Sequence, residues 1–218
     1  MNNLTIEEFP NGIKIYQGLD GYKFTKDAID LAKSCNIKHT DSVLEMCAGS
    51  GVVSFYTYSL CNFQKLYLNE IQHNNCLIID KNIQFNQMEK VAKCLECNLK
   101  TLTVGDFSKK LDVIICNPPY FKVHGSKVND NYSIAISRHE IEVTLDEIVA
   151  KAGELIKDKG RFYLCMMPNR MAETVATLSK HRFECKTIKF LRNSKGEINL
   201  CLFEAVYNAK SGVQLIVE

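Results

Sequence analysis

Short apolar runs alternate with longer mixed stretches along the first half of the chain. Runs at 43–46, 65–69 and 111–116 have the length of strands, and each is followed by polar or small residues. The stretches 52–60 and 75–87 between them have the length and apolar content of helices. Strands and helices that alternate in this way predict an α/β fold with a mostly parallel sheet and helices on both faces.

The second half departs from simple alternation near its end. A strand is expected at 99–104, before the run at 111–116. Thr144 and Glu147 form a capping box that begins a helix, and a strand at 161–167 follows it. The runs 187–191 and 198–207 are separated by a short polar loop. That spacing predicts an antiparallel hairpin closing the sheet.

The composition is that of an ordinary globular protein, with 46% hydrophobic and 24% charged residues. A chain of 218 residues predicts one domain at 1–218, with an N-terminal extension at 1–42 and a core at 43–218. No apolar run is long enough to cross a membrane, and Glu7 and Glu8 stand where a signal peptide would be basic. We therefore expect a cytoplasmic protein with no membrane partner. The net charge of +2 permits a nucleic-acid partner without requiring one.

Ten cysteines raise the question of a disulfide framework or a metal site. Most of them, such as Cys116, Cys165 and Cys201, interrupt apolar runs, which indicates small core residues in a reducing compartment. Cys94 and Cys97 form a CxxC pair, but no second pair stands at the spacing of a zinc site. We expect no bound metal.

The tetrapeptide Asn117-Pro118-Pro119-Tyr120 follows the apolar run at 111–116. A proline pushes the residue before it into an extended conformation, so the Asn117 amide can point in few directions. The oxygen atoms of Asn117 and of the Pro118 carbonyl are two acceptors beside the Tyr120 ring. This arrangement suits a flat substrate that carries an NH2 group, although Asn-Pro is also ordinary in turns.

Other polar and glycine residues stand at the ends of neighbouring strands. Gly49 and Gly51 lie in a turn of small residues between the strand at 43–46 and the following helix, the order that opens a nucleotide-binding unit. Glu70 ends the next strand about 20 positions later, where an acid can reach a ribose. Asp106 ends the strand expected at 99–104. Ligands of open α/β sheets bind at these carboxyl ends, which predicts one ligand site.

The chain resembles the class I S-adenosylmethionine-dependent methyltransferases, Rossmann-like proteins whose seven-stranded sheet ends in such a hairpin. Within that class it is similar to the bacterial tRNA (adenine-N6) methyltransferases that modify adenine 37 of a valine tRNA. The shared pieces extend over nearly the whole chain, and they are 24–28, 45–51, 69–72, 116–121, 138–140 and 195–199. Cys47 departs from the general class, which has a glycine at that place, but a cysteine there is familiar in the tRNA subfamily.

The resemblance implies that S-adenosylmethionine is the cofactor. Gly49 and Gly51 then lie against its methionine part, Glu45 lies near its ammonium, and Glu70 accepts hydrogen bonds from its ribose. Asp106 accepts from its adenine amine, unless it only caps a turn. The other residues expected at the cofactor are Thr25, Asp27, Cys47, Phe107 and Asn117.

The resemblance also implies N6-methylation of an adenine in tRNA, with Asn117, Pro118 and Tyr120 as the catalytic group. Asn117 and Pro118 accept the two N–H bonds of the amine, and Tyr120 stacks on the base after it has been rotated out of its stack. His139 is a candidate general base, but we assign it no role in the site.

A basic segment at 180–195 is the candidate RNA surface. It has six Lys or Arg residues and one acid, Glu184. Lys189, Arg192 and Lys195 are expected to contact phosphates, together with Lys122 at the start of a polar loop at 122–137. A solvated edge strand explains the basic segment equally well.

Three alternatives remain at this point. A protein glutamine-N5 methyltransferase would grip its planar amide with the same tetrapeptide, and a DNA adenine methyltransferase would share the chemistry. Such enzymes usually carry a substrate-recognition domain, and 42 residues precede Val43. A catalytically silent RNA-binding module would not need Asn117, Gly49 or Glu70. The sequence does not indicate an oligomeric state.

Overall fold

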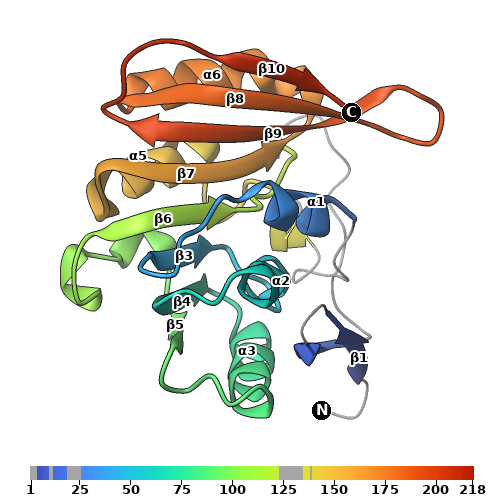
Figure 1. The fold of residues 1–218 in the computed structure, drawn as a ribbon, viewed down its shortest axis with the longest axis vertical. Helices are drawn as coiled ribbons and strands as arrows, with labels where there is room; N and C mark the ends of the chain where they lie inside the picture. Colours follow the sequence, from blue (N-terminus) through green and yellow to red (C-terminus); the bar gives the residue numbers. More distant parts are fainter. Residues whose placement is uncertain (1–3, 10–11, 19–25, 123–134, 138) are drawn as a thin grey trace.

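The computed structural model describes residues 4–9, 12–18, 26–122, 135–137 and 139–218. Within these residues, eight strands form one sheet in the order β10-β8-β9-β7-β6-β3-β4-β5 (Figure 1). The parallel part of the sheet consists of β3 (Ser42–Met46), β4 (Lys65–Glu70), β5 (Ala92–Glu96), β6 (Leu111–Cys116) and β7 (Ile156–Met166). The chain runs from β3 outward to β5 and then returns to β6 on the other side of β3. This reversal makes the carboxyl ends of β3 and β6 a topological switch point, where such sheets bind ligands.

The predicted hairpin is present and closes the parallel part of the sheet. β8 (Phe183–Arg192) pairs antiparallel with β9 (Ile198–Tyr207), and β9 pairs antiparallel with β7. One further strand, β10 (Gln214–Val217), lies parallel to β8 at the edge. It extends the expected seven strands to eight, and its four residues are too few to produce a clear alternation in the sequence.

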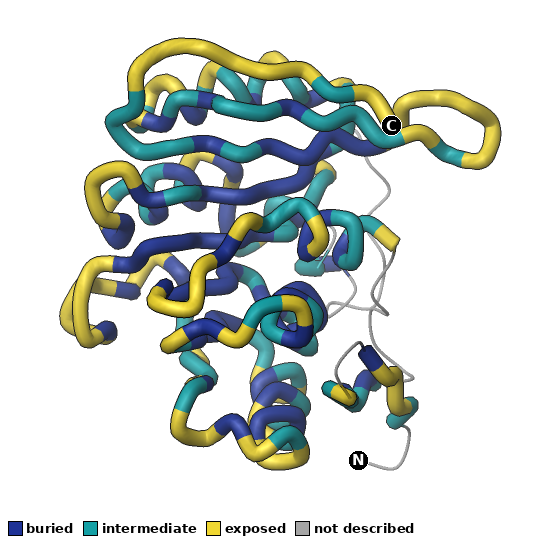
Figure 2. Tube along the Cα trace, in the orientation of Figure 1, coloured by how far each residue is buried: buried dark blue, intermediate teal, exposed yellow. Residues whose placement is uncertain are grey.

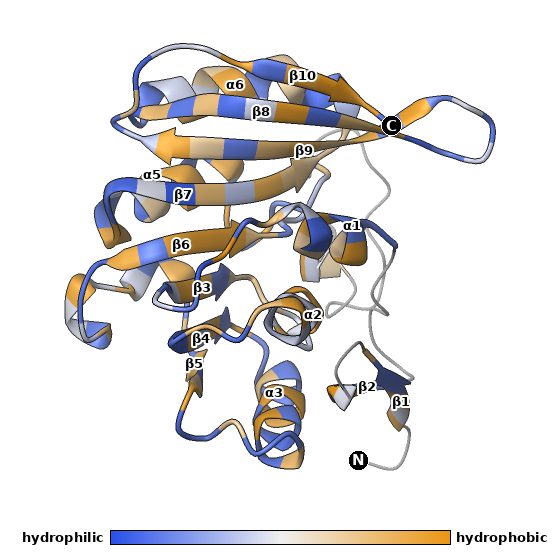
Figure 3. Cartoon of the chain, in the orientation of Figure 1, coloured by the Kyte–Doolittle hydropathy of each residue, from blue (hydrophilic) through white to orange (hydrophobic). Residues whose placement is uncertain are grey.

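Helices cover both faces of the sheet (Figure 1). The helices of one face are α1 (Lys26–Ser34), α2 (Val52–Leu60) and α3 (His73–Phe85), and those of the other are α5 (Leu145–Leu155) and α6 (Met171–Lys180). Neighbouring residues of a strand point to opposite faces. Val43 therefore packs with α1 to α3, whereas Leu44 packs with α5 and α6. Because both faces are covered, the central strands are buried and apolar along most of their length (Figures 2 and 3).

The strand predicted at 99–104 is wrong. The true strand is β5, and two short 3₁₀ segments follow it at Leu99–Thr101 and Val104–Asp106. Leu99 and Leu102 are both buried, and their spacing of three residues matches the repeat of a 3₁₀ turn. The apolar content that resembled a strand therefore comes mainly from one 3₁₀ turn, whose Leu99 and Leu102 are buried, because the second segment buries no residue.

The N-terminal extension contains an antiparallel hairpin of β1 (Leu4–Glu8) and β2 (Lys14–Gly18). The side-chain amides of Asn82 and Asn86, one turn apart on α3, each exchange two hydrogen bonds with the backbone of β2. These paired hydrogen bonds fix the hairpin against α3 in the way that a neighbouring strand would. Among the described residues, no helix has the length and apolar character of a membrane span.

Candidate active site

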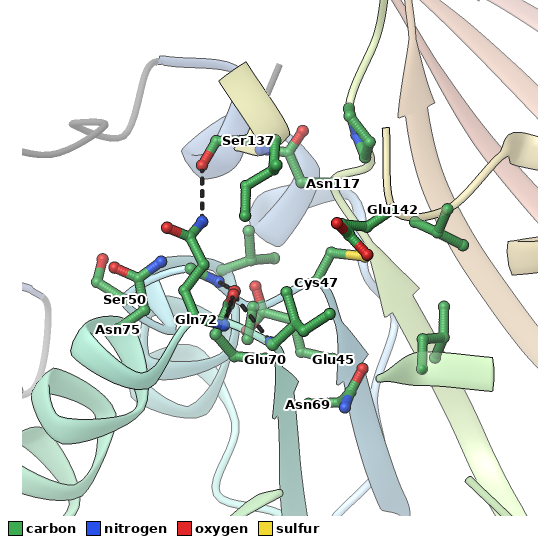
Figure 4. A pocket seen from close by; sticks show the side chains of 18 of the residues that line it. Glu45, Cys47, Ser50, Asn69, Glu70, Gln72, Asn75, Asn117, Ser137 and Glu142 are labelled. Atoms are coloured by element: carbon green, nitrogen blue, oxygen red, sulfur yellow. Dashed lines mark hydrogen bonds between the residues drawn. The ribbon is translucent and has the colours of Figure 1, made fainter. Parts of the chain in front are cut away.

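A cavity opens at the switch point between β3 and β6 (Figure 4). Its walls come from the carboxyl ends of β3, β4, β5 and β6 and the segments that follow them, together with Ile136, Ser137, Glu142 and Val143. The expected residues that line it are Glu45, Cys47, Gly49, Glu70 and Asn117. Expected residues from β3, β4 and β6 therefore meet in one cavity, and the residues beyond β5 that join them were not the expected ones.

Gly49 and Gly51, in the turn after β3, have different structural roles. Gly49 has a φ of 57°, and a Cβ atom added to it would meet nothing within 4 Å. Gly51 has a φ of 82°, and its Cβ would lie 2.8 Å from side-chain atoms of Leu68 and Phe55. Gly49 thus leaves open space beside the cavity for a ligand to approach the backbone, and Gly51 lets the loop pack on the sheet.

Cys47 begins this loop in the same left-handed region, with a φ of 56°. That conformation costs a residue with a side chain about 1–2 kcal/mol. Cys47 nevertheless keeps its place in the cavity wall, where the general class has a glycine. Cys47 therefore adopts the left-handed conformation that favours glycine and still lines the cavity.

Glu70 joins the end of β4 to the glycine loop. Its Oε2 accepts a hydrogen bond from the Gly49 amide at 2.7 Å. Its Oε1 accepts from the amides of Ile71 at 3.0 Å and Gln72 at 2.8 Å. Burial raises the pKa of this carboxyl, and the backbone donors oppose the shift. The Asn75 side chain, which also lines the cavity, donates a further hydrogen bond to this carboxylate.

Glu45 is a buried acid in the floor of the cavity. Only 1% of the residue is exposed, and its Oε2 accepts a hydrogen bond from the Ser54 amide at 3.0 Å. Burial raises the pKa of the Glu45 carboxyl to about 8. A cationic ligand group beside it would favour the ionised form, so this residue fits the expected ammonium.

Asn117 lies between this cavity and a second one. The second cavity has walls of Pro118, Tyr120, Phe121 and Met167, with Asp27, Ser137 and Asn199 as further polar residues. Asn117 lines both cavities. Its Oδ1 accepts hydrogen bonds from the Tyr120 hydroxyl at 2.6 Å and the Cys165 thiol at 3.0 Å. One side-chain amide thus separates two spaces that can each hold a ligand.

Four of the expected cofactor residues do not line the first cavity: Gly51 packs on the sheet, Asp27 lines the second cavity, and Asp106 and Phe107 line neither. Asp106 is exposed, and its Oδ2 accepts from the backbone and hydroxyl of Thr103 at 2.8 and 3.0 Å. These hydrogen bonds lower the pKa of Asp106 and make it the cap of a 3₁₀ turn. Phe107 is buried, with its ring edge-on to Tyr67 at 4.9 Å. Neither residue lines the cavity, because β5 ends at Glu96 rather than at 104.

Asn98 lines the cavity just beyond β5 and was not among the residues expected from the sequence. Its Oδ1 accepts from the Lys100 amide at 3.0 Å, so it begins a 3₁₀ turn and Leu99 follows in the wall. A strand placed correctly at 92–96 would have identified it, since it then stands at the expected carboxyl end.

Arg170, a second residue not expected from the sequence, connects the tetrapeptide to Glu140. Its Nη1 donates to the Tyr120 carbonyl at 3.0 Å, and its Nη2 lies 2.7 Å from Glu140 Oε1. The Glu140 amide donates to the Phe121 carbonyl at 2.8 Å. His139 is buried beside the Phe121 ring, at 5.6 Å between centroids. Glu140 and His139 therefore hold the segment that carries Glu142 and Val143 to the cavity.

The expected RNA contacts have varied surroundings. Lys122 pairs with Glu173 at 3.1 Å, and Lys189 pairs with Glu218 at 3.0 Å. Arg192 donates to the Gly196 carbonyl at 2.5 Å, and Lys195 is exposed in the loop between β8 and β9. Thr25 and most of the loop at 122–137 lie outside the described residues.

Comparison with known proteins agrees with this architecture. Residues 23–191 match the family model of the methyltransferase small domain. Methanocaldococcus jannaschii Trm5, solved in complex with adenosine, superposes with a TM-score of 0.67 over 95% of this chain and 56% of that chain, at 18% identity. The predicted class I methyltransferase fold is confirmed.

Two curated relatives differ in their substrates. The tRNA1(Val) (adenine(37)-N6)-methyltransferase of Flavobacteriaceae bacterium strain 3519-10 is 22% identical over 148 residues, 68% of this chain and 61% of that protein. The release factor glutamine methyltransferase of Mycoplasma mycoides subsp. mycoides is 26% identical over 131 residues, 57% of this chain and 45% of that protein. The chain thus spans less than two thirds of the length of either relative.

Proposed function

The chain belongs to the methyltransferase small domain family, and from that premise we propose that it transfers a methyl group from S-adenosylmethionine to N6 of an adenine in tRNA. The observation that carries the proposal is the position of Asn117, which lines two cavities at once. One cavity has the buried acids and the glycine loop that suit a nucleoside cofactor. The other has aromatic and apolar walls that suit a flat base.

The residues of the first cavity fit the cofactor. Glu70 is positioned to accept hydrogen bonds from the ribose, and Glu45 to face the ammonium. The open space at Gly49 admits the ligand close to the backbone. Asn98 has the role that the sequence predicted for Asp106, beside the adenine of the cofactor. When bound, S-adenosylmethionine supplies an electrophilic methyl group.

The residues of the second cavity prepare the amine for attack. The amino nitrogen of adenine shares its lone pair with the ring, which makes it a poor nucleophile. Asn117 Oδ1 and the Pro118 carbonyl accept its N–H bonds and draw the nitrogen toward tetrahedral geometry. Positive charge grows on the nitrogen during transfer, and these fixed dipoles stabilise it. Tyr120 stacks on the rotated base.

The proposed RNA surface lies at the same edge of the sheet as the two cavities. β8 runs parallel to β7, because both pair antiparallel with β9. Arg192 and Lys195 therefore stand at the carboxyl edge, and Asn199 at the start of β9 reaches the second cavity. A tRNA held by this loop would present a base to Asn117. We propose that the reaction takes place in the cytoplasm. The described residues contain no cluster of acidic, His or Cys side chains that could hold a metal.

Adenine 37 of a valine tRNA is the specific substrate that we propose, since several relatives carry that name. A release factor glutamine is the second candidate, because Asn-Pro-Pro-Tyr grips any planar NH2 and relatives of that name also match. The test incubates the protein with cofactor and an unmodified valine tRNA transcript, then maps new methyl groups by nuclease digestion and mass spectrometry. A transcript with guanine at position 37 is the matched control.

N6-methyladenosine at position 37 in the first transcript and none in the control is the expected result. Methylation of a release factor in a parallel reaction, with the transcripts unmodified, would support the second candidate and contradict the first.

A further inference from the structure

Two donors occupy the Asn117 side-chain oxygen. The Tyr120 hydroxyl lies 2.6 Å from Oδ1 and the Cys165 thiol lies 3.0 Å from it. A side-chain amide oxygen has two lone pairs, so its capacity to accept is filled. The Tyr120 oxygen and the Cys165 sulfur are themselves 3.1 Å apart. Each carries one hydrogen, and when both point at Asn117 neither is left to donate to the other. A substrate amine can therefore reach this oxygen only if one donor leaves.

The two donors differ in their freedom to move. Cys165 is a residue of β7 with 0% exposure, and its backbone pairs with Leu202 of β9. Burial raises the pKa of its thiol to about 12, so the thiol keeps its hydrogen at neutral pH. Tyr120 is only partly buried and forms a wall of the second cavity. Its hydroxyl is therefore the donor that can leave.

We propose that Cys165 is a positioning residue that orients the Asn117 amide, and that the Tyr120 hydroxyl occupies the place of the target amine until the substrate arrives. The proposal rests on the proposed function, because it assigns the Asn117 oxygen to an amine. It has a specific consequence. Removal of the Cys165 thiol lowers kcat, whereas removal of the Tyr120 hydroxyl, which donates to the same oxygen, strengthens substrate binding.

The first arm of the test removes the thiol. Cys165→Ala should lower kcat roughly 3- to 10-fold, the effect of one lost hydrogen bond. KM for RNA and cofactor affinity should stay near wild type, because Cys165 lines neither cavity. Cys165→Ser should restore kcat, since its hydroxyl also donates. Cys201→Ala is the matched control: this buried cysteine of β9 pairs with Met166, and the variant measures the cost of a cavity alone.

The second arm removes the hydroxyl. Tyr120→Phe keeps the stacking ring, so KM for RNA should fall by a similar factor, about 3- to 10-fold, because no hydrogen bond must break before the amine binds. Tyr120→Ala should raise KM through the loss of stacking. A KM that is unchanged or higher in Tyr120→Phe would show that the hydroxyl does not hold the place of the amine.

The third arm does not depend on turnover. The infrared difference spectrum between wild type and Cys165→Ser isolates the S–H stretch of Cys165, which hydrogen bonding moves to lower frequency. In an Asn117→Ala, Tyr120→Phe background, which removes both nearby oxygen acceptors, this band should shift to higher frequency. An unshifted band, or equal losses of kcat in Cys165→Ala, Cys165→Ser and Cys201→Ala, would overturn the role of Cys165. Wild-type protein that leaves every RNA unmodified would instead contradict the proposed function, while the infrared result would still decide the role of Cys165.

Discussion

The amide of Gly49 donates a hydrogen bond to Glu70 Oε2 at 2.7 Å, so the glycine loop after β3 and the acid that ends β4 form one unit. The two strands are neighbours in register, with Met46 beside Asn69. The carboxylate therefore shapes the loop in addition to facing the cavity. A change at Glu70 should alter both the contact with a ligand and the loop that holds it.

Glu70→Ala is expected to weaken binding of S-adenosylmethionine, because it removes the ribose acceptor and releases the Gly49 amide. Glu70→Gln keeps the shape but offers a single acceptor oxygen, and its affinity should be intermediate. Isothermal titration calorimetry measures both, with circular dichroism to show that the fold persists. Wild-type affinity in Glu70→Ala would remove Glu70 from the cofactor site.

Asn98→Ala should also weaken cofactor binding, because this side chain lines the cavity beyond β5. Asp106→Ala should leave the affinity near wild type, because its carboxylate only caps a turn with Thr103. Calorimetric titration of the two variants side by side gives the comparison. The opposite ranking would return the cofactor adenine to Asp106.

The buried Glu45 predicts a pH-dependent stability. The folded protein holds the Glu45 proton up to a pKa of about 8, whereas the unfolded chain releases it near the ordinary value of 4.5. Between these values the unfolded state binds fewer protons. The contribution of Glu45 to the free energy of unfolding is therefore full below 4.5 and falls as the pH rises to about 8, by at most about 1.4 kcal/mol per pH unit.

Glu45→Gln should remove that component and flatten the decline. Urea unfolding of both proteins at several pH values from about 5 to 8 provides the measurement. Parallel profiles for the two proteins would mean that the Glu45 carboxyl is ionised in the fold.

Asn117→Ala is expected to lower kcat about 10²- to 10³-fold, as the loss of one preorganised polar group does elsewhere. Its cofactor affinity should change little, because Asn117 is proposed to meet the amine. Single-turnover methyl transfer from labelled cofactor separates the two effects. Turnover within a few-fold of wild type would contradict the proposed chemistry.

The double variant Arg192→Glu with Lys195→Glu should weaken tRNA binding and reduce its salt dependence by about one unit of slope for each lost phosphate contact. Lys189→Gln should have a smaller effect, because Glu218 already pairs with that ammonium. Lys38→Glu, exposed just before β3 and outside the basic segment, is the control. Filter-binding titrations over a range of salt give the slopes, and an unchanged slope in the double variant would place the RNA surface elsewhere.

The sequence by itself determined the parallel core and much of the candidate site. Strands that are buried on both faces form nearly continuous apolar runs, so the runs at 43–46 and 111–116 were visible in the sequence although Glu45 and Asp112 interrupt them. The proline pair fixed the conformation of Asn117 locally, and glycine spacing placed Glu70. These signals depend on neighbours in the chain, which a sequence displays directly.

The tertiary structure alone decided what depends on contacts between distant segments. Only the packing of Leu99 and Leu102 shows that 99–104 forms turns, which moves the cavity residue from Asp106 to Asn98. Likewise, Arg170 and Cys165 reach the tetrapeptide across 50 and 48 positions of sequence. No sequence motif around either residue indicates its role. Cys165 in β7 and Arg170 just after it reach the tetrapeptide because the strand order places β7 beside β6.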